Sequence, residues 1–130
     1  TEGVKLFFEN GKCIKAEAKV GQETMDNYLE IDEGSSRLGE IALVDDSSAI
    51  SRTGLVFGSI LIDENASCHI ALGSGYTSNL EIGDKDPKDY GCNMSLVHTD
   101  FMVGSSDMRI TATTYKGEEV LIMEKGNFVF

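Results

Sequence analysis

The chain has 130 residues, 41% hydrophobic and 25% charged, and its formal net charge of -11 disfavours nucleic acid as a partner because acidic surfaces repel phosphate backbones. No apolar run approaches the roughly 20 residues that a membrane-spanning helix needs, and no secretory signal segment is recognisable, so we expect no membrane partner. Three cysteines without a Cys-x-x-Cys spacing argue against a disulfide framework, which favours a cytoplasmic protein.

The N-terminal part of the chain predicts a β-hairpin followed by a helix. Residues 4–9 and 12–20 are the predicted strands, and they flank Asn10-Gly11, a pair that tolerates the positive φ values of a tight hairpin turn. Residues 22–31 carry apolar side chains at helical spacing, which predicts a short amphipathic helix.

The rest of the chain predicts strands separated by loops. Residues 47–58 and 73–91 are rich in Ser, Gly or Asp and indicate loops, and residues 60–62 form a short apolar stretch. The predicted strands are residues 38–44, 68–72, 94–103, 108–115 and 118–124, with a final short strand near Phe128. Strands outnumber helices and short turns join neighbours, so we expect an α+β fold with a largely antiparallel or mixed sheet and a few short helices.

Two polar residues on one predicted strand are candidates for chemistry. His98 and Asp100 are two residues apart, so a strand places both side chains on the same face. An imidazole and a carboxylate in this relation can supply two metal ligands from a rigid backbone. A structural hydrogen-bonded pair is the alternative interpretation.

Three further residues have similar settings within apolar segments. Glu40 lies inside a predicted buried strand, where a carboxylate must be protonated, paired with a cation or bound to a metal. Glu64 follows an apolar stretch, and His69 precedes another. Carboxylates and imidazoles without thiolates are the usual ligands of two hydrolytic metal ions. The alternatives are a Glu40 interaction with Arg37, Arg52 or a backbone donor, and a structural core histidine at position 69.

Three segments in this order resemble signatures of the M29 aminopeptidases, the thermophilic metalloprotease family. They are LGEIALV at residues 38–44, DENASCHIALG at residues 63–73 and VHTDFMVG at residues 97–104. Three motifs in the same order and at similar separations make a specific match, and the resemblance covers nearly the whole chain.

The resemblance implies a metallopeptidase that removes N-terminal residues from peptides. It implies two divalent metal ions, zinc, cobalt or similar, and a homodimer. Tyr76 matches a family tyrosine near the metals, where its phenol assists the reaction electrostatically. Glu40 is expected to bridge the two ions. The implied metal ligands are Glu40, Glu64, His69, His98 and Asp100.

The chain also departs from the family pattern. The family has a further glutamate ligand in a Phe-Thr-x-Pro context upstream, with a second glutamate nearby that is suited to act as general base. The only proline here is Pro87, so that motif is missing. We therefore expect residues 1–130 to be the metal-ligand-bearing C-terminal region, without the N-terminal region and inactive in isolation. The alternative function is a non-catalytic interaction or dimerisation domain in which these residues form a structural polar network.

Overall fold

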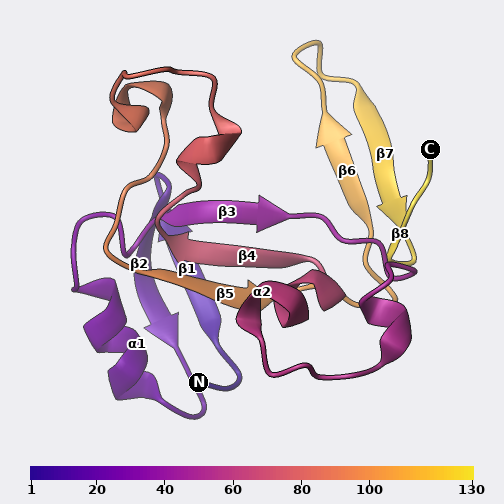
Figure 1. The fold of residues 1–130 in the computed structure, drawn as a ribbon, viewed down its shortest axis with the longest axis horizontal. Helices are drawn as coiled ribbons and strands as arrows, with labels where there is room; N and C mark the ends of the chain where they lie inside the picture. The colour runs from indigo at the N-terminus through magenta and orange to yellow at the C-terminus, as the bar shows by residue number, and fades with distance from the viewer. The chain divides into compact units, whose positions relative to one another are not determined.

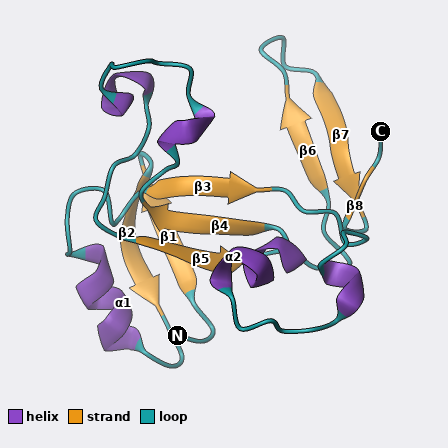
Figure 2. Ribbon diagram, in the orientation of Figure 1, coloured by secondary structure: helices purple, strands orange, loops and turns teal.

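The computed structural model describes residues 1–130, which form two compact units. The first comprises Thr1–Ile41 and Ile70–Asp100, and the second comprises Ala42–His69 and Phe101–Phe130. The chain contains three small sheets and two short α-helices (Figure 2), which confirms the predicted α+β class. None of its helices has the length and apolar character required to cross a membrane.

The first unit begins with the predicted hairpin. β1 (Lys5–Glu9) pairs antiparallel with β2 (Lys12–Glu17), and both turn residues have positive φ, 50° at Asn10 and 75° at Gly11. Helix α1 (Gln22–Leu29) packs against β2 and buries Met25 (Figure 1). The hairpin and the helix are confirmed, although β2 ends three residues and the helix two residues before the predicted boundaries.

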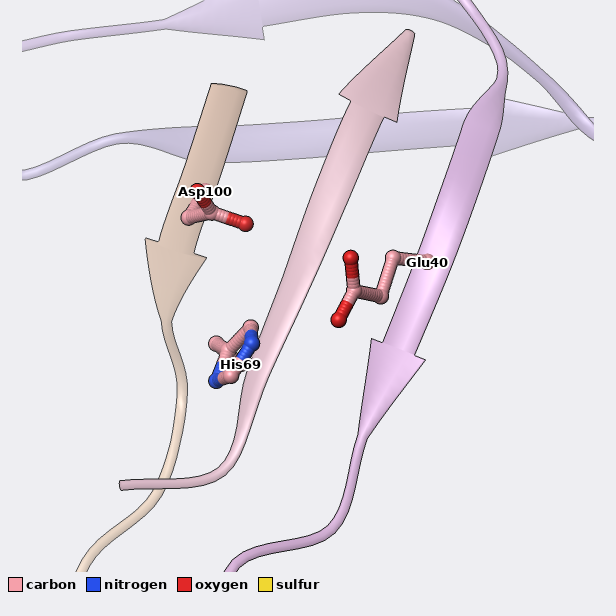
Figure 3. Close-up of side chains that lie close together, drawn as sticks. All are labelled: Glu40, His69 and Asp100. Atoms are coloured by element: carbon pink, nitrogen blue, oxygen red, sulfur yellow. The ribbon is translucent and has the colours of Figure 1, made fainter. Parts of the chain in front are cut away.

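The sheet that carries most candidate residues has the order β3-β4-β5. Its strands are β3 (Leu38–Ala42), β4 (His69–Gly73) and β5 (His98–Met102), and Figure 3 shows β4 running opposite to both neighbours. The central strand is the most buried of the three, and Leu72 is fully inaccessible. The strands predicted at residues 38–44 and 68–72 are confirmed, whereas the one predicted at residues 94–103 begins only at His98.

Asp32 explains why residues 95–97 do not extend β5. Its carboxylate accepts hydrogen bonds from the Leu96 backbone N–H at 2.7 Å, the Ser95 hydroxyl at 2.9 Å and the Ser35 backbone N–H at 2.8 Å. These bonds tie the segment before β5 to the turn after α1. These hydrogen bonds hold the pKa of Asp32 below its usual value. The bond from the Leu96 N–H has the largest effect, and those from Ser95 and Ser35 add to it.

Replacing Asp32 with asparagine should destabilise the chain at pH 7, with a loss that shrinks in acid. Because folding depresses the Asp32 pKa, its ionised form contributes stability above the unfolded pKa of about 3.9, and that contribution is lost as pH falls through the folded pKa. Urea unfolding from pH 7 to pH 3 measures the difference. The exposed Asp107→Asn variant is the control. A wild-type advantage that is constant with pH would contradict this role.

The second unit contains the predicted C-terminal hairpin. β6 (Ile110–Thr113), β7 (Glu119–Glu124) and β8 (Asn127–Phe128) form an antiparallel sheet in this order. Met123 on β7 is fully buried, and its Sδ lies 4.0 Å from the Sγ of the buried Cys68.

The remaining elements are short helical turns. Helix α2 (Ile60–Asp63) occupies the apolar stretch for which the sequence predicted no regular element. The Asp63 carboxylate accepts the backbone N–H groups of residues 57–59 at 2.8–3.1 Å, which closes the loop before α2. The predicted loops contain only 3₁₀ turns. These turns, together with the one that follows α2, are η1 (Ser51–Thr53), η2 (Glu64–Ala66), η3 (Thr77–Asn79) and η4 (Pro87–Tyr90).

Candidate metal centre

Three predicted ligands meet on the β3-β4-β5 sheet. Glu40 comes from β3, His69 from β4 and Asp100 from β5, and one ligand atom of each lies within 4.8 Å of the others. Figure 3 shows the two carboxylates pointing inward from the outer strands, with the His69 ring near the start of the central strand. Each strand therefore contributes one candidate ligand.

His98 adds a second imidazole to the same pair of carboxylates. Its Nδ1 lies 2.7 Å from the Ser74 carbonyl oxygen, which can only accept, so Nδ1 carries the hydrogen. In the neutral ring Nε2 then presents a lone pair. That nitrogen lies 3.4 Å from Glu40 Oε2 and 3.3 Å from Asp100 Oδ1.

Two carboxylate oxygens that approach one imidazole nitrogen favour a positive charge among the three atoms. A proton on Nε2 would supply one, but neither His98 Nε2 nor Asp100 Oδ1, both buried, makes a hydrogen bond within the chain. Tetrahedral ligands about 2.0–2.2 Å from zinc are separated from one another by about 3.3–3.6 Å. The spacings of 3.3 and 3.4 Å match that separation, so the donor set fits a divalent ion.

His69 is oriented in the same way as His98. Its Nδ1 lies 2.9 Å from the Ser67 carbonyl oxygen, and the residue is 1% exposed. With the hydrogen on Nδ1, the lone pair of the neutral ring lies on Nε2. Backbone carbonyls thus select the same tautomer for both imidazoles, as they do for many metal-bound histidines.

Two glycines allow the strands to approach closely around these ligands. A Cβ on Gly39, next to Glu40, would lie 2.3 Å from the Gly73 carbonyl oxygen and 2.4 Å from that of Ser74. Gly73 has a φ of 106°, and its Cβ would lie 2.0 Å from the Val97 carbonyl oxygen. Side chains at either position would move the backbone that carries Glu40 and His98.

The other candidates occupy different positions. The Tyr76 ring, half exposed, lies 5.1 Å from the His98 ring at an angle of 54°, so its phenol borders the centre. Glu64 lies on η2 and is not one of the three residues whose ligand atoms meet within 4.8 Å. The ion pair that the structure records for Glu40 is with His98 and not with Arg37 or Arg52.

Sequence reasoning missed the groups that orient the imidazoles. These groups are the backbone carbonyls of Ser67 and Ser74, and any residue type can provide a carbonyl. The only available signal was indirect, since Gly73 and Gly75 flank Ser74 and mark a tightly approached backbone.

Comparison with known proteins identifies relatives of the whole chain. The thermophilic metalloprotease (M29) family matches residues 1–128. The chain is 42% identical over 133 residues to Aminopeptidase 2 of Geobacillus stearothermophilus, covering 99% of this chain and 32% of that protein. It is 40% identical over 131 residues to Aminopeptidase T of Thermus aquaticus, covering 98% of this chain and 32% of that protein.

A solved structure shares the fold. Wild-type AmpT from Thermus thermophilus superposes with a TM-score of 0.87 at 43% sequence identity, over 99% of this chain and 32% of that chain. The chain therefore spans about a third of the length of the relatives that it matches.

Proposed function

This chain belongs to the M29 family of thermophilic metalloproteases, and from that premise we propose that it supplies the metal-ligand region of a metal-dependent aminopeptidase. The observation that carries the proposal is the approach of Glu40 and Asp100 to His98 Nε2 at 3.4 and 3.3 Å. Homology to aminopeptidases supports peptides as the substrate and the N-terminal amino acid as the released product.

The proposed ligands would hold two divalent ions, zinc, cobalt or similar. Glu40 and Asp100 lie near both imidazoles, so these two carboxylates together with His69 and His98 would hold the ions. Glu64 is the proposed fifth ligand. Bound ions of this kind polarise the scissile carbonyl and lower the pKa of a bound water toward about 7.

The chain's own residues would position and stabilise the reacting groups. Ser67 and Ser74 carbonyls hold the imidazoles in the metal-binding tautomer. The Tyr76 phenol beside His98 is suited to donate a hydrogen bond to negative charge that develops on the substrate carbonyl. The Phe-Thr-x-Pro glutamate motif of the family is missing, so we propose that residues 1–130 are the family's C-terminal region and that the isolated chain binds metal without turnover.

Isothermal titration with zinc or cobalt tests the proposed centre. His98→Ala and His69→Ala should each weaken binding at least about tenfold, because each removes a ligand from a preformed set. Proton release should accompany binding wherever an imidazole was protonated beforehand. Asp107→Ala, an exposed acid in the second unit, is the control. Unchanged titration heats in both histidine variants would refute the assignment.

The same samples should not hydrolyse aminoacyl-anilides, whereas a full-length relative should do so in a metal-dependent way. Turnover by the purified 130-residue chain would contradict the role assigned to the missing glutamates.

An exposed apolar run favours association as a second function. Leu55, Val56, Ile60 and Leu61 lie within seven residues of one another in the second unit and are 63%, 88%, 75% and 71% exposed. Extensive apolar exposure is typical of surfaces that another protein covers. We propose a homodimer, which sedimentation equilibrium would reveal as twice the 14.1 kDa chain mass. The three cysteines are all free, which fits the cytoplasm as the proposed compartment.

A further inference from the structure

A pocket of about 560 Å³ in the first unit is lined by two cations. Arg37 precedes β3, and Lys88 lies on η4. Glu33 is the one acidic side chain in the lining, so the pocket has a net positive charge in a protein whose net charge is -11.

Neither cation is neutralised within the chain. Arg37 and Lys88 form no ion pair with Glu33 or with any other carboxylate. The backbone of Lys88 donates to Asp86 Oδ1 at 2.9 Å, but its ammonium group stays unpaired. With acidic groups outnumbering basic ones 22 to 11, two unpaired cations in one concave site indicate a place for an external anion.

The backbone beneath Arg37 is held firmly. Its N–H donates to the Gly34 carbonyl at 3.0 Å, and its own carbonyl accepts from the Gly73 N–H at 2.8 Å. The guanidinium lies over the hairpin turn, where a Cβ on Gly11 would be 3.7 Å from Nη1. The Arg37 side chain therefore lines the pocket from a backbone that two hydrogen bonds hold in place.

This pocket adjoins a second one of about 340 Å³ that contains Glu40 and Tyr76. The two share the lining residues Leu38, Gly91, Cys92 and Asn93. Asn93 is fixed in position at this boundary, because its side-chain amide donates to the carbonyls of Gly34 at 2.8 Å and Gly73 at 2.6 Å. The cation-lined pocket is therefore a neighbour of the pocket that holds Glu40.

We propose that Arg37 and Lys88 bind a carboxylate of the peptide substrate, an inference that rests on the proposed aminopeptidase function. Arg37 lies three residues before Glu40, a backbone distance of roughly 10 Å along an extended strand. An odd separation directs the two side chains to different faces, in agreement with the separate, adjoining pockets that they line. An extended peptide of about three residues spans the same distance. A peptide whose N-terminal residue reaches the metal centre then places its third residue at the two cations. The carboxylate is either the C-terminus of a tripeptide or an acidic side chain at that position.

Binding of short peptides to the metal-free chain tests the proposal. In chelator, amide shifts of Gly91 and Asn93 in the ¹⁵N-labelled chain report the affinity for trialanine, for trialanine amide and for Ala-Ala-Asp amide. Trialanine should bind about three- to tenfold more tightly than its amide, as expected for two solvent-accessible ion pairs. Ala-Ala-Asp amide tests the side-chain source. Affinity for it equal to that for trialanine means that the site takes a carboxylate from either source.

Arg37→Gln and Lys88→Gln should each reduce the preference for the free carboxylate, and the double variant should abolish it. Arg37→Gln retains the backbone hydrogen bonds of this residue, so we expect the variant to fold. The matched controls Arg52→Gln and Lys116→Gln remove cations in the second unit and should leave the preference intact. Equal affinity for trialanine and its amide in the wild-type chain, or a preference that persists in the double variant, overturns the proposal.

Failure of this proposal and failure of the proposed function are distinguishable. The peptide measurements use no metal, and the zinc titrations use no peptide. A carboxylate preference without zinc binding would retain the anion site and reject the metal centre, and zinc binding without the preference would do the reverse.

Discussion

Replacing Glu40 with glutamine should raise the melting temperature of the chain in chelator and reduce the increase that zinc produces. In the metal-free chain the Glu40 carboxylate lies 3.4 Å from His98 Nε2 and within 4.8 Å of an Asp100 oxygen. Glutamine has nearly the same shape, carries no charge and has an amide that can donate to the His98 nitrogen.

The two effects have opposite signs. One gained hydrogen bond contributes about 1 kcal/mol, which corresponds to a rise of about 3–5 °C for a chain of this size. A neutral amide is a weaker ligand than a carboxylate, so zinc affinity should fall at least about tenfold. That loss removes about 1.4 kcal/mol or more of the stabilisation that a fixed excess of zinc provides.

Melting curves of the wild-type chain and Glu40→Gln, each with chelator and with zinc, measure both effects. Glu81→Gln, which removes an exposed acid on the loop after η3, is the control for overall charge. If Glu40→Gln melts lower than wild type in chelator and gains as much from zinc, Glu40 is a structural partner and not a ligand.

Replacing Gly73 with alanine should cost about 3 kcal/mol or more and abolish zinc binding. Its φ of 106° is unfavourable for any L side chain, and the new Cβ would lie 2.0 Å from the Val97 carbonyl oxygen. That carbonyl accepts the Ser74 N–H at 2.7 Å, and Ser74 in turn orients His98. The clash therefore disturbs the backbone on both sides of the imidazole.

Two other glycines separate strain from overlap. Gly117 has a φ of 81° but open space around its Cβ position, so Gly117→Ala should cost only about 1–2 kcal/mol. Gly39 has no positive φ but would place its Cβ 2.3 Å from the Gly73 carbonyl, so Gly39→Ala tests overlap alone. Urea unfolding and zinc titration of the three variants give the comparison. A Gly73→Ala chain as stable as Gly117→Ala would show that the sheet relaxes around the added methyl.

The sequence predicted those elements whose geometry depends only on residues that are adjacent in the chain. Asn10-Gly11 predicted the first hairpin because both residues accept positive φ, and the period of two placed His98 and Asp100 on one strand face. The short helix α2 was missed because Ile60, Leu61 and Ile62 are too few to show a helical period.

Only the tertiary structure decided which polar groups meet. The Asp32 carboxylate accepts a hydrogen bond from Leu96, more than sixty residues away in sequence, and β5 therefore begins at His98 and not at residue 94 as predicted. Glu40 reaches His98 across the sheet, and a Ser74 carbonyl selects the tautomer. Arg37, considered from sequence as a partner of Glu40, faces another pocket. Alternation along a strand assigns each side chain to a face from the sequence of that strand alone. The partners on that face depend on strand order and register, which long-range packing and glycine contacts determine.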